Sequence, residues 1–300
     1  MQLPLIKNPI QLGDFKKLAR DLTLVENDLA GSEDLLKELR TSDTPVIGIT
    51  GPPGAGKSTL VNAIINYLSS QGKSIAVLAI DPTSPFNLGS LLGDRVRMSE
   101  QFNKPNVFIR SLATRGSLGG LSGKTIEMTD VLKSSGFDYI LVETVGVGQS
   151  EVEIAGLADI SVVVLVPESG DEIQSMKSGL MEIADIFVVN KSDREGAEAF
   201  ANNLKKLVHQ QTEIIPVINT IADKAAGVDE LMQVIQDQPF KNNSRRAYLL
   251  AEKAWKLIQH EKMKNISRIK LHEEISIASV DPSFNLYRFV DRILGNIKNS

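Results

Sequence analysis

The chain has 300 residues, 42% of them hydrophobic and 23% charged, which is the composition of a folded protein with one large domain or two smaller ones. It contains no cysteine, which excludes a disulfide scaffold, a thiolate metal site and a cysteine nucleophile. Thirty-three basic against 37 acidic side chains give a net charge of −4, and this balance argues against binding nucleic acid through its phosphates.

Neither a membrane span nor a targeting segment is expected. The first thirty residues have no uninterrupted apolar stretch, and the longest apolar runs, such as 162–167, are short. A membrane-spanning helix needs about 20 apolar residues. We therefore expect a soluble, cytoplasmic protein.

The first forty residues and the residues that follow differ in pattern. Residues 10–40 have the apolar spacing of helices, and 41–45 have loop composition. Seven β-branched apolar runs come next and lack alternation, which is typical of strands buried on both faces. The runs are 46–49, 75–80, 107–109, 139–142, 160–166, 186–189 and 214–218. Helical patterns between them include 58–70, 123–135 and 195–209.

Alternation of strands and helices predicts an α/β fold with a doubly wound, mostly parallel sheet. Ligands of such folds bind beyond the carboxyl ends of the strands. No strand-like run follows residue 242, and helices are predicted at 244–264 and at 282–297, the second opening at Asp281-Pro282. We expect an N-terminal helical extension (1–44), a nucleotide domain (45–240) and a C-terminal helical arm (241–300).

A phosphate-binding loop follows the first predicted strand and opens a helix. Its sequence matches G-x-x-x-x-G-K-[ST] in full: Gly51-Pro52-Pro53-Gly54-Ala55-Gly56-Lys57-Ser58. Glycines let successive N–H groups face the phosphates, and the helix that begins near Lys57 adds its positive end. Lys57 is expected to neutralise the β- and γ-phosphates, and Ser58 to offer its hydroxyl to Mg²⁺. Thr59, the next residue, is also expected to contact the nucleotide. The fold is thus predicted to be that of P-loop NTPases.

The base is predicted to be guanine. The element N-K-x-D, here Asn190-Lys191-Ser192-Asp193, directly follows a predicted strand. The Asp193 carboxylate can accept from N1–H and the N2 amino group of guanine, whereas adenine would leave it unpaired. Lys191 is expected to lie over the purine. Further base contacts are expected from the backbone of three residues after the last strand: Thr220, Ile221 and Ala222.

Carboxylates at strand ends are candidates for the magnesium site. Asp81 ends the second predicted strand, and Glu143 ends the fourth in the position of the D-x-x-G aspartate of Walker-type GTPases. Asp94, in a loop, is a further candidate. Together with Ser58 these residues form the predicted metal set. The N–H of Gly146 is expected to sense the γ-phosphate.

Catalysis is assigned to Lys57, Glu143 and Gln149. The position just after the D-x-x-G glycine, where Ras-like enzymes carry the water-orienting glutamine, holds Val147, and Gln149 lies two residues further on. We therefore predict slow intrinsic hydrolysis, with a turnover below about 1 s⁻¹.

Several unusual strings occur in the chain in a fixed order. They are the phosphate loop, V-L-A-I-D-P-T-S around Asp81, L-L-G-D-R-V-R-M around Asp94, R-S-L-A-T-R-G-S-L-G-G from Arg110, E-T-V-G-V-G-Q-S-E from Glu143 and N-K-S-D from Asn190. Over about residues 45–240 the chain resembles the MeaB/ArgK family, the GTPases associated with methylmalonyl-CoA mutase.

The resemblance implies a homodimeric, Mg²⁺-dependent GTPase that hydrolyses GTP to GDP. It also implies a chaperone of an adenosylcobalamin-dependent acyl-CoA mutase that gates cofactor loading and protects or reactivates the mutase. The segment 170–174 resembles a mutase-facing loop, and the C-terminal helices resemble the dimerisation arm of the family. Where members often carry Gly-Ile-Lys-Lys, this chain has Ser175-Met176-Lys177-Ser178. The partner could therefore be a related mutase, such as isobutyryl-CoA mutase.

Three other functions compete with this interpretation. A metallochaperone GTPase of the HypB/UreG kind would use Cys and His ligands, but the chain has no Cys and only His209, His260 and His272. A kinase associated with arginine/ornithine transport is the second alternative, and no acceptor site specific to such a kinase is visible. A P-loop scaffold that binds nucleotide without hydrolysing it would be distinguished by a single-turnover GTP assay.

Overall fold

The computed structural model describes residues 14–40, 42–81, 99–113, 123–144, 154–169, 180–208, 215–238 and 251–298, the last without 252, 253, 256, 260 and 265. The chain divides into two compact units, Met1–Leu250 and Ala251–Ser300. None of the described helices has both the length and the apolar character needed to span a lipid bilayer.

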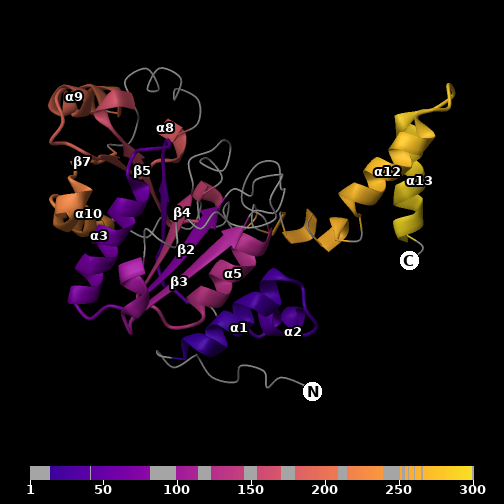
Figure 1. Ribbon diagram of the computed structural model, residues 1–300, viewed down its shortest axis with the longest axis horizontal. Helices are drawn as coiled ribbons and strands as arrows, with labels where there is room; N and C mark the ends of the chain where they lie inside the picture. The colour runs from indigo at the N-terminus through magenta and orange to yellow at the C-terminus, as the bar shows by residue number, and fades with distance from the viewer. Residues whose placement is uncertain are drawn as a thin grey trace. The chain divides into compact units, whose positions relative to one another are not determined.

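A seven-stranded sheet forms the centre of the first unit (Figure 1), with the strand order β3-β2-β4-β1-β5-β6-β7. Every neighbouring pair is parallel. The strands are β1 (Val46–Thr50), β2 (Ile75–Asp81), β3 (Val107–Ala113), β4 (Tyr139–Thr144), β5 (Ile160–Leu165), β6 (Ile186–Val189) and β7 (Val217–Asn219). The predicted α/β class and parallel sheet are confirmed, with one strand for each of the seven apolar runs.

Helices cover both faces of this sheet. Within the described residues, the α-helices of the first unit are α1 (Phe15–Glu26), α2 (Ser32–Lys37), α3 (Lys57–Ser70), α5 (Gly123–Lys133), α8 (Leu180–Ile183), α9 (Ala197–Val208) and α10 (Val228–Asp237). The crossover from β1 through α3 to β2 moves toward the β3 edge, whereas those through α5 and α9 move toward β7. Because such crossovers are right-handed, α3 and α5 lie on opposite faces.

The main core lies between the sheet and the pair α3 and α10. Alternate residues of the strands, such as Ile47 and Ile49 of β1, point into it together with Leu60, Ile64 and Leu231 of the helices. All five of these side chains are fully buried. The helix α10, which completes this layer, was not predicted from the sequence.

The N-terminal helices pack within the first unit. The ring of Phe15 lies 5.5 Å from that of Phe108 on β3 and 6.2 Å from that of Phe137, measured between centroids. Arg110 of β3 forms an ion pair with Glu26 at the end of α1. The predicted N-terminal extension is therefore joined to the edge of the sheet by both apolar and ionic contacts.

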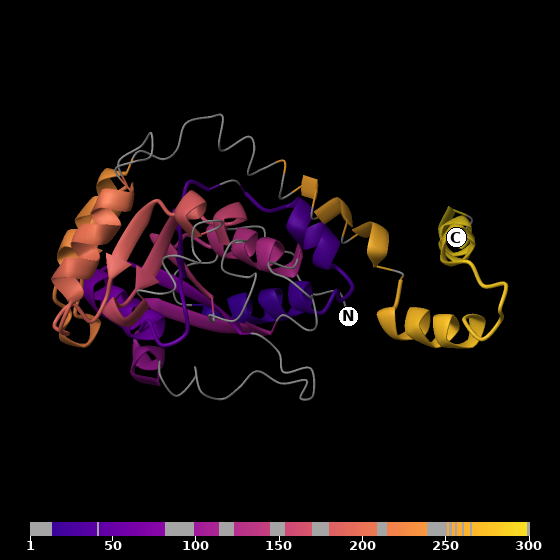
Figure 2. The same cartoon turned by 90° about the horizontal axis from the view of Figure 1, so that it is seen from above.

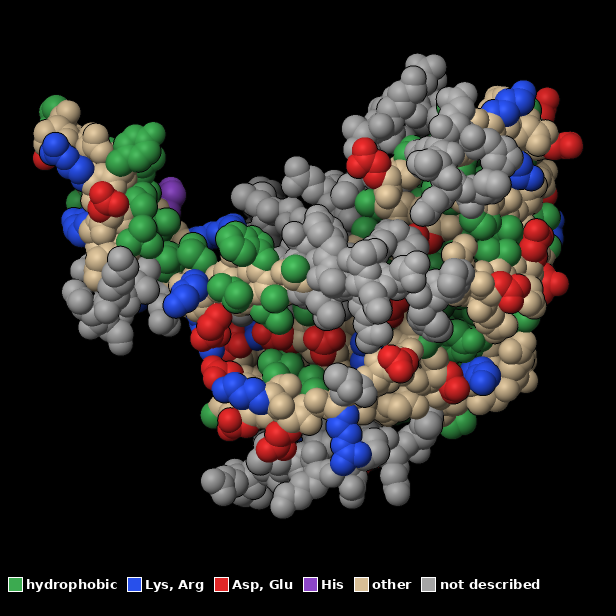
Figure 3. Space-filling view, turned by 180° about the vertical axis from the view of Figure 1, so that it is seen from behind, with side chains coloured by type: hydrophobic (Ala, Val, Ile, Leu, Met, Phe, Trp, Pro, Cys, Tyr) green, Lys and Arg blue, Asp and Glu red, His purple; other side chains and the backbone are tan. Residues whose placement is uncertain are grey.

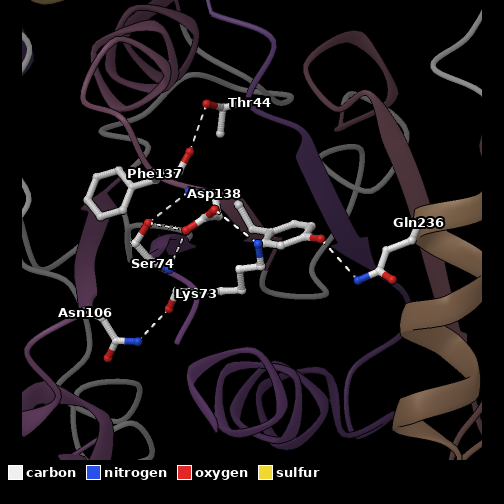
Figure 4. A network of polar contacts seen from close by, with 8 residues as sticks. Thr44, Lys73, Ser74, Asn106, Phe137, Asp138 and Gln236 are labelled. Atoms are coloured by element: carbon white, nitrogen blue, oxygen red, sulfur yellow. Dashed lines mark hydrogen bonds and ion pairs between the residues drawn. The ribbon is translucent and has the colours of Figure 1, made fainter. Parts of the chain in front are cut away.

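Polar contacts join the amino ends of the strands (Figure 4). One oxygen of Asp138, Oδ2, accepts from the backbone N–H of Ser74 at 2.8 Å and from its hydroxyl at 2.7 Å. Nearby, the hydroxyl of Thr44 donates to the carbonyl of Phe137 at 3.0 Å. These bonds fix the amino edge, so the loops at the opposite, carboxyl edge rise from strands that are held in register.

The described part of the second unit includes the helices α12 (Arg268–Ala278) and α13 (Leu286–Lys298), joined by residues 279–285 (Figure 2). Its described residues between 251 and 263 are also helical, within the helix predicted at 244–264. The prediction that the last helix opens at Asp281-Pro282 is wrong. The carboxylate of Asp281 instead closes a turn by accepting from the N–H of Ser283 at 2.8 Å, and the side chain of Asn285 caps α13. The helix α12, which begins after the cap Ser267, was also not predicted from the sequence.

Candidate nucleotide site

The phosphate loop lies between the end of β1 and the start of α3, and two of its glycines also lie against neighbouring segments. Gly51 has φ +138°, and a Cβ there would lie 2.1 Å from the carbonyl oxygen of Val164 on β5. Gly56 has φ +86°, and a Cβ there would lie 2.4 Å from the Asn190 amide nitrogen. The loop therefore packs directly against the neighbouring strand and against the predicted base-recognition element.

Lys57 lies beneath this loop and is 7% exposed. Its ammonium group donates to the carbonyl oxygens of Gly51 at 2.7 Å and Pro52 at 2.9 Å. Those carbonyls thus turn toward the lysine. The ammonium is already positioned within the loop where a triphosphate would need a positive charge.

Ser58 and Glu143 meet across the sheet edge. The Ser58 hydroxyl donates to Glu143 Oε1 at 2.5 Å, and Glu143 is 4% exposed. The register of the parallel strands places Glu143 beside Ile49 of β1 and Ala79 of β2. Because the phosphate loop follows β1, this pairing brings the carboxylate close to the loop. A hydroxyl and a carboxylate oxygen are ligands that Mg²⁺ prefers, and these two residues fit that ion.

The other predicted metal ligands are only partly described. The backbone of Asp81 ends β2 beside Ala113 of β3, which is at the same edge of the sheet. Asp94 lies outside the described residues. Among the residues that the structure describes, no group of three or more His, Cys, Asp and Glu side chains could hold a metal ion.

Asn190 connects three segments of the site. Its amide nitrogen donates to the carbonyl of Ala55 in the phosphate loop at 2.9 Å. Its amide oxygen accepts from the Thr220 hydroxyl and from the N–H of Ala222, both at 3.1 Å. The residue is 2% exposed. This asparagine therefore holds the phosphate loop, the 190–194 turn and the 220–222 segment together.

Lys191 adds a second link to the phosphate loop. It has φ +55°, which is unusual for a residue with a side chain, and its ammonium group donates to the carbonyl of Gly54 at 2.7 Å. This orientation holds the ammonium group at the phosphate loop. From there the aliphatic part of the Lys191 side chain can lie over a bound base.

Asp193 lies at the surface of the same turn. Its Oδ2 accepts from the ammonium of Lys224, at the end of η5 (Ala222–Lys224), at 3.0 Å. This hydrogen bond lowers the pKa of the Asp193 carboxyl below its ordinary value. The group is therefore ionised at neutral pH, as an acceptor for two guanine donors must be.

The three residues predicted to contact the base through their backbone have bonds of their own. The N–H groups of Thr220, Ile221 and Ala222 donate to the Val189 carbonyl, the Ala226 carbonyl and the Asn190 amide oxygen, respectively. A base contact from this segment stays a prediction. In the structure, the segment holds Asn190 in place.

Two further predicted site residues, Gly146 and Gln149, lie outside the described residues. The structure joins Ser58 to Glu143, and it joins Lys57, Asn190 and Lys191 to carbonyls of the phosphate loop. Sequence reasoning missed Lys224, because no motif marks it. Its only signal was its position two residues after a segment already assigned to the base.

Comparison with known proteins identifies the family. The family model for the methylmalonyl Co-A mutase-associated GTPase MeaB matches residues 18–278. A Pyrococcus abyssi protein named as a GTPase is 46% identical over 83% of this chain and 79% of its own length. The GTPase ArgK of Escherichia coli is 36% identical over 76% of this chain and 73% of its own length. The mouse methylmalonic aciduria type A homolog, mitochondrial, is 34% identical over 86% of this chain and 69% of its own length.

Solved structures confirm the fold. A crystal structure of a LAO/AO transport system kinase has a TM-score of 0.66 at 24% sequence identity, covering 96% of this chain and 94% of that one. HypB from Helicobacter pylori in complex with nickel has a TM-score of 0.50 at 16% identity, covering 78% and 97%. At these identities the likeness is one of fold. Together with the extent of the family match, it shows that the chain belongs to the MeaB family and is a P-loop GTPase.

Proposed function

We propose that this GTPase hydrolyses Mg²⁺-bound GTP at the phosphate loop and acts as a chaperone for an adenosylcobalamin-dependent acyl-CoA mutase of the methylmalonyl-CoA mutase type. In this role it gates loading of the cofactor and protects or reactivates the mutase. The observation that carries the partner assignment is the match of the mutase-associated family model to residues 18–278.

The bond between Ser58 and Glu143 supports the magnesium site. When bound, Mg²⁺ would supply positive charge against the phosphate groups of the nucleotide. Ser58 would hold the ion with its hydroxyl, and the buried Glu143 carboxylate would hold it directly or through water. Asp81 and Asp94 are proposed as further ligands, on the strength of their positions in the sequence.

The base assignment is supported by the contacts of the N-K-x-D residues. Asn190 and Lys191 both donate hydrogen bonds to carbonyls of the phosphate loop. The residues that would bind the base are therefore held in a fixed position relative to the loop that would bind the phosphates. The ionised Asp193 carboxylate would accept from guanine N1–H and N2, which adenine cannot match.

A homodimer formed through the C-terminal unit is supported by its surface. Of the twelve large apolar side chains exposed in the described part of the chain, all but Leu29 and Phe102 belong to 251–300. Figure 3 shows apolar side chains grouped on the surface of this unit. A patch of this kind on a small helical unit marks an interaction site.

The partner is tested by binding of the full chain to purified methylmalonyl-CoA mutase and isobutyryl-CoA mutase of the same organism. Surface plasmon resonance would compare the chain without nucleotide, with GDP and with a non-hydrolysable GTP analogue. We expect affinity for one mutase to change by at least about ten-fold between nucleotide states, which is the range of an allosteric coupling.

The matched control for this experiment is Ser58→Ala. This variant loses the hydroxyl bonded to Glu143, so its mutase affinity should no longer differ between the GDP and the GTP-analogue states. Absence of binding to both mutases, or equal affinity in all three nucleotide states of the unmodified chain, would contradict the chaperone role.

Each of two alternative functions can be tested directly. Nickel delivery of the HypB kind would show as stoichiometric nickel binding, and phosphorylation of a transport protein would show as transfer of the γ-phosphate to protein. We expect neither, because the curated relatives at 36–46% identity carry the GTPase name and the likeness to HypB is one of fold.

A further inference from the structure

We propose that Lys224 is a specificity-determining residue of the nucleotide site, and that its ammonium group positions the Asp193 carboxylate for guanine. This inference rests on the proposed assignment of Asp193 to the base. It adds a residue from outside the N-K-x-D element.

The backbone around Asp193 is fixed, whereas its side chain projects to the surface. The N–H of Arg194 donates to the carbonyl of Lys191 at 3.0 Å, which closes the turn, and the N–H of Ser192 donates to the carbonyl of Thr220 at 3.0 Å. The Asp193 side chain is 40% exposed. A short carboxylate in such a position can rotate about its own bonds unless a partner holds it.

Lys224 is that partner, and a compact loop presents it. The N–H of Lys224 donates to the carbonyl of Ile221 at 2.9 Å, and the loop closes through an antiparallel bridge between Ile221 and Ala226. The next glycine, Gly227, has φ +75°, and a Cβ there would lie 2.1 Å from the Asn219 carbonyl oxygen. The tight turn that ends η5 therefore aims Lys224 at the neighbouring loop, 3.0 Å from Asp193 Oδ2.

The geometry leaves room for the base. Each carboxylate oxygen has two lone pairs, so Oδ2 can keep its bond to Lys224 while both oxygens accept from the guanine N1–H and N2 groups. A carboxylate that is already held loses less rotational freedom when the base binds. The hydrogen bond from Lys224 lowers the pKa of Asp193, and the positive charge of Arg194 lowers it further. The same hydrogen bond raises the pKa of Lys224, and the negative charge of the neighbouring Asp223 raises it further.

The first test is GDP affinity of the Lys224→Ala full chain, measured by isothermal titration calorimetry at neutral pH. We expect the dissociation constant for GDP to rise about three- to five-fold, the upper range for one exposed ion pair. Weak binding of ADP should not change. Lys224→Arg keeps the cation and should restore most of the GDP affinity, and Lys206→Ala, at an exposed lysine of α9, should leave it unchanged.

The second test separates positioning from a structural role of the loop. In an Asp193→Asn background, Lys224→Ala should cause no further loss of GDP affinity, because the carboxylate that Lys224 holds is gone. An equal loss of GDP affinity in both backgrounds, or no loss in either, would overturn the role of Lys224. The assignment of Asp193 to the guanine base would then still stand. If Asp193→Asn left the guanine preference unchanged, the base assignment itself would fail, and this inference with it.

Discussion

At the scale of residues, the side chains behind the phosphate loop explain its shape. Lys57 bonds to the carbonyls of residues 51 and 52, Lys191 to that of residue 54 and Asn190 to that of residue 55. Four carbonyls of one short loop thus accept from the side chains of these three residues. With these carbonyls turned toward the donors, the glycine-rich backbone can present N–H groups to an anion. Two motifs 133 residues apart, at Lys57 and Asn190, therefore form one structural unit.

Lys57→Ala removes the buried cation of this unit. We expect GTP affinity to fall by about one hundred-fold, because charge-assisted hydrogen bonds to phosphate are lost. Titration calorimetry with a non-hydrolysable GTP analogue measures the loss, and Lys73→Ala, at the opposite edge of the sheet, serves as the control. Unchanged affinity in Lys57→Ala would show that the triphosphate binds elsewhere.

At the scale of elements, the sharp turn from β1 into the phosphate loop depends on Gly51. Gly51→Ala would force a Cβ against the Val164 carbonyl at a φ of +138°, so we expect a loss of roughly 3 kcal/mol of unfolding free energy. Gly156→Ala is the matched control, because a Cβ there meets nothing within 4 Å. Urea denaturation of both variants checks this, and equal stability would contradict the packing of the loop on β5.

The elements also show how far the sequence predicts the fold. All seven strands are predicted because buried parallel strands are unbroken β-branched runs. The helix α12 is not predicted, because none of its residues is buried and its apolar side chains do not gather on one face of the helix. The site is predicted where motifs mark it, as at Lys57, Ser58, Glu143 and Asn190. Lys224 is not predicted, since its proposed role depends on the turn at Gly227 and on Asp193, which lies 31 residues away in the sequence.

At the scale of the whole molecule, the apolar surface of the C-terminal unit predicts self-association. The double substitution Ile277→Glu and Tyr287→Glu places charges where side chains are now 78% and 81% exposed. Light scattering should give the unmodified chain twice the 32.7 kDa mass of one chain, and the variant a single mass. The control Lys270→Glu changes a charge on α12 and should remain dimeric. A monomeric unmodified chain would contradict the dimer.

The most direct test of the account is the steady-state turnover of GTP by the full chain with Mg²⁺ and with EDTA. We predict Mg²⁺-dependent turnover below about 1 s⁻¹, and a decrease of at least about ten-fold in Glu143→Gln, which loses the carboxylate bonded to Ser58. Glu230→Gln, the same change at an exposed position of α10, should behave as the unmodified chain. Turnover that is independent of Mg²⁺, or equal in Glu143→Gln, would contradict the central claim.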